Sequence, residues 1–136
     1  MELKLTLPWP PTVNNYKTVG ALTKTKTGKM YQRRVNSRET TAFYYQVYMR
    51  AKRGMPLEWL KYADSDVICY ELRVNLYPPD NRRRDIDNVL KALLDSLVHA
   101  HVIKDDSQIC RLIAEKMCNI EQGQVIVTLK EYIKCT

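Results

Sequence analysis

Residues 67–77 read VICYELRVNLY, and this stretch decides the fold. Apolar and polar side chains alternate along it, which is typical of a β-strand with one buried face. Prolines at positions 78 and 79 end the pattern, because proline cannot donate a hydrogen bond to a sheet. The predicted buried face consists of Ile68, Tyr70, Leu72, Val74 and Leu76, opposite Glu71, Arg73 and Asn75. Such a strand needs neighbouring strands and a helix to cover its apolar side.

The segments that follow this strand predict one helix and two more strands. The helix spans about residues 87–100, since its apolar side chains recur at helical spacing. Its apolar stripe consists of Ile86, Leu90, Leu93, Leu94 and Leu97. Strands are predicted near residues 108–118 and 124–133, and residues 121–124 have the composition of a hairpin turn between them.

The segments that precede it predict a strand and a second helix. Residues 2–7 alternate apolar and polar side chains, as in a half-buried strand. A helix is predicted to begin at Asn36, which has capping character, and to stop at Gly54 and Pro56. Residues 57–65 show no clear period and are predicted to be an irregular connection.

These elements together predict an α+β fold, with a single mixed β-sheet and two helices packed on it. The 136 residues fit one domain, spanning residues 1–136. A basic loop is predicted at about residues 14–35, with Thr27, Gly28 and Lys29 at a turn between two extended arms.

Positive charge is concentrated in that N-terminal quarter. The chain carries a net charge of +7, and residues 3–38 contain eight basic and no acidic side chains. A concentrated basic segment suits a polyanion, because phosphate contacts release counterions. The alternative is a solvated loop that only aids solubility.

The sequence also predicts a cytoplasmic protein. It contains no stretch of about 18 apolar residues that could span a membrane. Its first residues lack the basic segment and apolar run of a signal peptide. No C-x-x-C pair occurs among Cys69, Cys110, Cys118 and Cys135. We therefore expect free thiols in a reducing compartment, and a zinc site from His99, His101 and Cys110 has no recognisable spacing.

Acidic side chains gather where the second helix is predicted to start. Asp85 and Asp87 are two residues apart in an extended segment, which sends both carboxylates to the same side. Lys91 follows Asp87 by one helical turn. The pair Asp105 and Asp106 offers a third carboxylate from a later loop, if the fold brings that loop close. Such acids, with water and phosphate oxygens, are the ligands that Mg²⁺ prefers. In a purely structural alternative, Asp87 caps the helix and pairs with Lys91, and Asp105 and Asp106 form a turn.

Three motifs follow one another along almost the whole chain. They are LPWPP at residues 7–11 with NNY at 14–16, RDIDNVLKALLDSL at 84–97, and VIKDDSQI at 102–109. In order and spacing, this chain resembles the RusA family of Holliday-junction resolvases. The central motif is far more specific than any single pair of aspartates.

The resemblance implies a RusA-like fold and a homodimeric, phage- or prophage-encoded nuclease. Such an enzyme resolves four-way DNA junctions by paired symmetric cuts in recombination and repair, with Mg²⁺ or Mn²⁺ as cofactor. By resemblance, Asp85, Asp87 and Asp106 are metal ligands, and they act in catalysis together with Lys91.

Basic side chains are expected to contact DNA phosphates, which positions a duplex without reading its sequence. The predicted contacts are Lys24, Lys26, Lys29, Arg33, Arg34, Arg82, Arg83 and Arg84. Two rival functions remain open at this stage: a junction-binding architectural protein that does not cut, and a metal-dependent phosphotransfer enzyme that acts on flaps or RNA.

Overall fold

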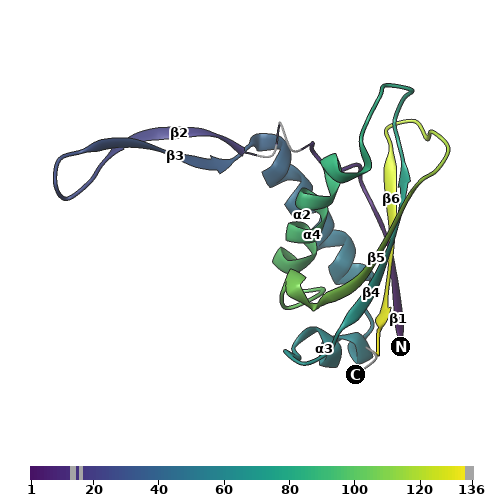
Figure 1. Ribbon diagram of the computed structural model, residues 1–136. Helices are drawn as coiled ribbons and strands as arrows, with labels where there is room; N and C mark the ends of the chain where they lie inside the picture. Colours follow the sequence, from purple (N-terminus) through teal and green to yellow (C-terminus); the bar gives the residue numbers. More distant parts are fainter. Residues whose placement is uncertain (13–14, 16, 134–136) are drawn as a thin grey trace.

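A four-stranded mixed sheet, covered on one face by helices, forms the body of the computed structural model (Figure 1). The structure describes residues 1–12, 15 and 17–133. The strands of this sheet are β1 (Glu2–Leu7), β4 (Tyr70–Tyr77), β5 (Ile109–Lys116) and β6 (Gln124–Glu131). They lie in the order β1-β6-β4-β5, and only the β4–β5 pair is parallel. The predicted α+β class with a mixed sheet is confirmed.

The predicted hairpin between the last two strands is wrong, because β4 lies between β5 and β6. A parallel β4–β5 pair requires a crossover through the intervening helix, which leaves the other edge of β4 open to β6. The turn at Gly123, where φ is 71°, therefore ends a longer connection that passes from one side of β4 to the other.

Two helices, α2 (Arg38–Gly54) and α4 (Leu90–His99), pack on the sheet as predicted, and both lie on the same face (Figure 1). A third helix, α3 (Leu57–Ala63), replaces the predicted irregular connection. Its seven residues contain one buried side chain, Trp59, so no helical period could be recognised. Trp59 Nε1 donates to the carbonyl of Val102 at 2.9 Å, which fixes α3 against the segment after α4.

The starts of the two long helices differ slightly from the prediction. Ser37, not Asn36, caps α2, and its side chain accepts a hydrogen bond from the Thr40 amide. The helix predicted from residue 87 divides into a 3₁₀ turn, η1 (Ile86–Val89), and α4. A second 3₁₀ turn, η2 (Asp106–Gln108), leads into β5.

The hydrophobic core lies between the sheet and these helices. Its largest fully buried side chains include Trp59, Tyr70, Leu7, Leu72, Leu76, Leu93, Leu97, Ile103 and Leu129. The polar side chains of β4 point to the opposite face, where Glu71 is buried between Arg111 and Lys130, each 3.7 Å away. That face is polar, so the helices cover only one side of the sheet.

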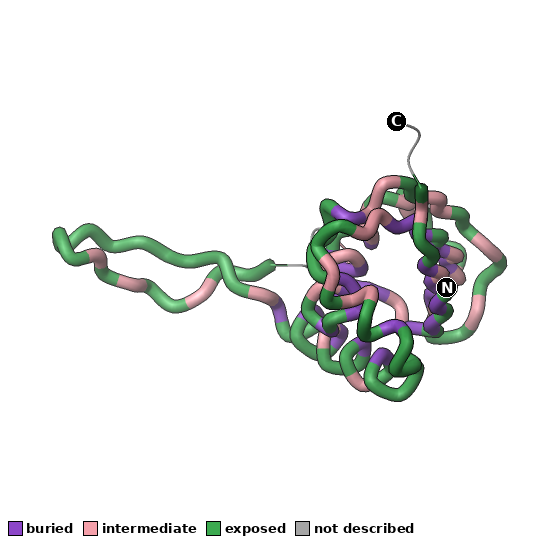
Figure 2. The backbone as a smooth tube through the Cα atoms, turned by 90° about the horizontal axis from the view of Figure 1, so that it is seen from below, coloured by how far each residue is buried: buried purple, intermediate pink, exposed green. Residues whose placement is uncertain are grey.

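The predicted basic loop is a β-hairpin that projects from the body (Figures 1 and 2). It consists of β2 (Lys17–Lys24) and β3 (Met30–Asn36), which form a separate two-stranded sheet. Gly28, with φ of 89°, sits in the turn at its tip, a conformation that favours glycine. Residues 14 and 16 of the predicted loop lie outside the described residues.

Within the described part of the chain, no helix is long and apolar enough to cross a membrane. Cys110 and Cys118 are free thiols, whereas Cys135 lies outside the described residues. None of the three described cysteines belongs to a group of three metal-ligating side chains, so the zinc alternative has no support there.

Candidate active site and nucleic-acid interface

The loop between β4 and η1 is fixed by an ion pair between Arg84 and Asp80. Arg84 Nη1 lies 2.6 Å from Asp80 Oδ1, and its guanidinium carbon lies 5.8 Å from the centre of the Trp9 ring. Lys116 Nζ donates to the Arg84 carbonyl at 2.8 Å. These contacts tie the residue before Asp85 to the end of β5.

The same ion pair changes the acidity of Asp80. A hydrogen bond from Arg84, and then one from the Arg82 amide, lower the pKa of Asp80 from 3.8 to about 2. Because the folded pKa is the lower one, the unfolded chain binds more protons between these two values. The contribution of this pair to stability is therefore complete above the unfolded pKa and is lost as the pH falls through the folded pKa.

We expect Asp80→Asn to lower the urea midpoint of unfolding at neutral pH. The difference from wild type should shrink between about pH 5 and pH 2, as the wild-type carboxylate becomes protonated. Urea unfolding followed by circular dichroism at a series of pH values measures this difference. Glu121→Gln, which alters an exposed acid in a nearby loop, is the control. A difference that stays constant down to the lowest pH would show that the Arg84 pair contributes nothing.

Asp85 and Asp87 stand exposed at the start of η1. Asp85 is extended, with φ −87° and ψ 142°, and its side chain caps no backbone amide. Among the described residues, neither carboxylate has a hydrogen bond or ion pair. Lys91 pairs with Asp95 instead of Asp87, at 3.2 Å. The helix-cap alternative is therefore not observed, and both carboxylates remain available for a cation.

The second acidic segment contains two aspartates with different roles. Asp105 caps η2: its carboxylate accepts hydrogen bonds from the amide and hydroxyl of Ser107. The hydrogen bond from the Ser107 hydroxyl, followed by the one from its amide, lowers the pKa of Asp105. Asp106 is exposed and has no such partner within the described ranges. One aspartate thus holds the turn, and the other presents an open carboxylate.

Gln108 anchors this acidic turn to the body, and no role was predicted for it from the sequence. Its side chain is buried; Oε1 accepts from the amides of Lys104 at 3.0 Å and Asp105 at 3.1 Å. Its Nε2 donates to the carbonyls of Ser65 at 2.7 Å and Ile68 at 3.1 Å. The signal in the sequence was its position three residues after Asp105, which is the spacing of a capping box. Gln108 therefore positions the turn that carries Asp106.

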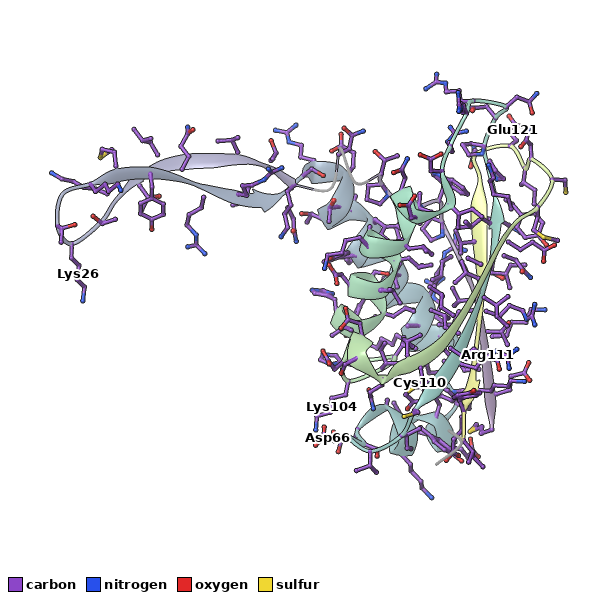
Figure 3. All side chains as sticks on the ribbon, in the orientation of Figure 1. Lys26, Asp66, Lys104, Cys110, Arg111 and Glu121 are labelled. Atoms are coloured by element: carbon purple, nitrogen blue, oxygen red, sulfur yellow. The ribbon has the colours of Figure 1, made fainter. Side chains whose placement is uncertain are left out.

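An ion pair outside the turn adds to this anchoring. Lys104 Nζ lies 2.7 Å from the carboxylate of Asp66, and the two side chains meet at the end of the molecule away from the hairpin (Figure 3). The hydrogen bond to Asp66 raises the pKa of Lys104. This pair is exposed, so we assign the positioning of the turn mainly to Gln108.

The two acidic segments lie at opposite ends of β5 and α4 (Figure 1). Asp106 is just before Ile109, the first residue of β5, whereas Asp85 is near Lys116, the last. Eight strand residues span about 23 Å, and the ten residues of α4 span about 15 Å. Within the described chain, no three His, Cys, Asp or Glu side chains are grouped to hold a metal. One chain therefore brings Asp85 to Asp87, but not to Asp106.

An aromatic surface adjoins the second acidic segment and was not foreseen from the sequence. The rings of Tyr44 and His99 lie 5.0 Å apart. They border a pocket of about 380 Å³ whose lining residues are Asn36, Thr41, Tyr44, Tyr45, Tyr48 and His99. Both also line a neighbouring hollow that contains Asp95, Asp105 and Asp106. Asp106 thus faces a partly aromatic concavity on the helical side of the molecule.

The predicted DNA-contacting side chains fall into two groups. Five are exposed on the hairpin, and Figure 3 shows Lys26 at its tip. These five are Lys24, Lys26, Lys29, Arg33 and Arg34. Of the arginines before Asp85, Arg82 and Arg83 are exposed, whereas the Arg84 side chain is only 17% exposed and is committed to Asp80. Arg84 thus has a structural role in addition to any contact with a phosphate.

Comparison with known proteins identifies relatives along nearly the whole chain. The sequence model of the family described as Endodeoxyribonuclease RusA matches residues 8–130. The crossover junction endodeoxyribonuclease rusA of Enterobacteria phage HK97 is 33% identical over 107 residues, covering 79% of this chain and 76% of that protein. The proteins named Crossover junction endodeoxyribonuclease RusA from Shigella sonnei (strain Ss046) and Escherichia coli (strain K12) are each 29% identical, covering 93% of this chain and 92% of theirs.

Proposed function

This chain belongs to the RusA family of endodeoxyribonucleases, and from that premise we propose that it resolves four-way DNA junctions by paired symmetric cleavage. One observation carries the proposal. Asp85, Asp87 and Asp106 keep exposed carboxylates without partners in the described structure, although Asp80 and Asp105 in the same segments are bonded. Unpaired acids beside basic side chains are what a metal-assisted phosphodiester cleavage needs.

We place this activity in recombination and repair of DNA in the cytoplasm of a bacterial cell. A relative encoded by phage HK97 supports a phage or prophage origin. The basic hairpin supports DNA as the substrate, because its charge complements phosphates over a long arm.

The cofactor proposed is Mg²⁺, with Mn²⁺ as a substitute, since exposed carboxylates are hard oxygen ligands. Asp85 and Asp87 fit part of such a site, but their distance from Asp106 excludes a three-carboxylate site built from one chain. Binding of the cation would supply a water of lowered pKa and neutralise charge on the scissile phosphate.

We propose that a homodimer completes the site. In a two-fold dimer whose α4 helices run antiparallel, the start of one α4 lies beside the end of the other. Asp85 and Asp87 of one subunit then lie beside Asp106 of the partner subunit. Three apolar side chains of α4 support this face as an interface: Leu90, Leu94 and Val98. They pack partly against the core but stay partly exposed, so a partner subunit could cover the rest of their surface. The dimer has two equivalent sites, as paired cuts in a two-fold symmetric junction require.

The basic side chains have separate roles in this arrangement. Lys91 is exposed one helical turn after Asp87, where its Nζ pairs with Asp95, and it would stabilise negative charge that grows on the phosphate. Arg82 and Arg83 would hold flanking phosphates, and Arg84 would keep their loop in place through Asp80. The basic side chains of the hairpin would hold phosphates of the junction.

A synthetic four-way junction tests the proposed function. We expect magnesium-dependent, symmetrically placed nicks, with a fall of at least about a hundredfold in Asp85→Asn because the charge held at the phosphate is lost. Denaturing gels map the cuts, and a gel-shift assay should show that junction binding persists in the variant. Glu58→Gln, an exposed acid on α3, is the control and should cut normally. Full activity of Asp85→Asn, or junction binding by wild type with no cut at any metal concentration, would refute the proposal.

A further inference from the structure

The projecting hairpin exposes apolar side chains as well as basic ones. Its exposed apolar residues are Val19 (61%), Leu22 (59%), Met30 (49%), Tyr31 (40%) and Val35 (41%). Single exposed apolar residues are ordinary on a protein surface, but five on one narrow arm are unusual. The hairpin packs on the body mainly at its root, near the start of α2, and Figure 2 shows it as largely exposed.

An isolated two-stranded hairpin is only marginally stable in water. The apolar side chains of this one are not used to bind it to the body. Their exposure therefore needs another explanation. The pattern of charge supports a surface that binds a ligand.

The register of the hairpin places apolar and basic side chains on one face. Residues opposite each other in an antiparallel pair share a face. The relevant pairs are Val19–Arg34, Leu22–Gln32 and Lys24–Met30. Since positions 30, 32 and 34 alternate along β3, all three pairs are on the same side. A bulge between Val19 and Leu22 bends the ribbon there. We call this side the wedge face.

Charge decides what the wedge face can contact. Residues 3–38 contain eight basic side chains and no acidic one, so the hairpin of a second copy would be repelled. A polyanion is attracted, and a nucleic acid with accessible bases, which the family match favours, also offers apolar surface to Leu22 and Met30. Apolar wedges between base steps are an established way for proteins to kink DNA.

We propose that the hairpin is a wedge for the branch point of a junction. Its basic side chains hold phosphates while Leu22 and Met30 enter between base pairs that flank the branch. Base pairs there have lost a stacking neighbour, so less stacking is broken than in a continuous duplex. The wedge would therefore favour branched over linear DNA. This inference rests on the proposed function, because it assumes a junction as the substrate.

The test separates apolar insertion from charge. Full-length protein is titrated, in EDTA so that no cutting occurs, into a four-way junction carrying 2-aminopurine beside the branch and into a linear duplex of matched sequence. Wild type should raise the 2-aminopurine fluorescence of the junction, because an unstacked base is brighter. Leu22→Thr/Met30→Thr, which keeps strand-forming residues, should abolish this rise and weaken junction binding about tenfold, with linear duplex within about twofold.

Three further variants make the result specific. Leu22→Ile/Met30→Leu should restore the fluorescence rise, because apolar volume is retained. Val35→Thr, on the opposite face of the same hairpin, should leave it unchanged. Lys26→Ala/Lys29→Ala should weaken binding to junction and linear duplex alike, because phosphate contacts do not distinguish a junction from a linear duplex. Circular dichroism checks that each variant is folded.

Several outcomes would overturn the wedge. One is the absence of a fluorescence rise with wild type, and another is an unchanged rise in Leu22→Thr/Met30→Thr. A third is an equal loss of affinity of that variant for junction and linear duplex. The fourth is a shift of that variant from dimer to monomer in sedimentation. The last would make the wedge face a subunit interface. Failure of the wedge and failure of the function remain distinct, since wild type that cuts junctions in magnesium without the fluorescence rise disproves only the wedge.

Discussion

We expect that mixing Asp85→Asn subunits with Asp106→Asn subunits restores cleavage that neither variant shows alone. This result is expected if each site takes Asp85 and Asp87 from one subunit and Asp106 from the other. In a mixed dimer, both substitutions then fall in the same site, and the second site is intact. If all ligands came from one chain, every site would keep one defect and mixing would restore nothing.

The expected yield follows from random exchange of subunits. About half of the dimers are mixed and each has one intact site, so about a quarter of all sites recover. The main product should be a nicked junction, because one site cannot make paired cuts. Differently tagged subunits, refolded together and purified through both tags, give the mixed dimer for gel analysis.

A matched mixture provides the control for this experiment. Asp85→Asn with Asp87→Asn should stay inactive, because both acids come from the same end of one subunit and every site keeps one defect. An inactive Asp85→Asn and Asp106→Asn mixture, with mixed dimers confirmed by native mass spectrometry, would rule out the shared site. Activity in a single variant would instead question the role of that acid.

Gln108→Ala is the substitution outside the acids from which we expect the largest effect. It leaves the amides of Lys104 and Asp105 and the carbonyls of Ser65 and Ile68 without their side-chain partner. Because the site is buried, we expect the free energy of unfolding to fall by about 3 kcal/mol. Each lost hydrogen bond contributes roughly 1 kcal/mol, and partial rehydration of the exposed groups offsets some of the total. Urea unfolding followed by circular dichroism measures this change.

The same substitution should impair cleavage where the protein is still folded, because the turn that presents Asp106 is no longer fixed. Gln46→Ala, on the exposed side of α2, is the control and should change stability by less than about 0.5 kcal/mol. A loss of stability with normal cleavage would mean that Gln108 supports the fold and does not position Asp106. No loss of stability would contradict the role described for it here.

Elements with a clear local pattern were predicted well from the sequence. The alternation at residues 2–7 and 67–77 and the apolar stripe of α4 are local, so each could be recognised without knowing its neighbours. The turn at Gly28 was recognisable for the same reason. The role of the acids near α4 stays a prediction, which rests on their local spacing and on the family motif.

What depends on contacts between distant segments was missed. The insertion of β6 between β1 and β4 leaves no trace in the alternation of β6 itself. The role of Gln108 depends on carbonyls some forty residues earlier in the chain. The separation of Asp85 from Asp106 depends on the direction of β5, which only the parallel pairing with β4 sets. The sequence therefore could not show that Asp106 lies away from Asp85 and Asp87 within one chain.

Because the hairpin is separate from the main sheet, it can evolve independently of that sheet. The ladder of the central sheet does not pass through β2 and β3, so mutations that lengthen or recompose the arm leave the core hydrogen bonds intact. If the arm sets the preference for one DNA shape over another, as proposed, that preference can change under selection while Asp85, Asp87 and Asp106 stay unchanged. Laboratory grafting of a foreign arm between residues 17 and 36 would exploit the same independence.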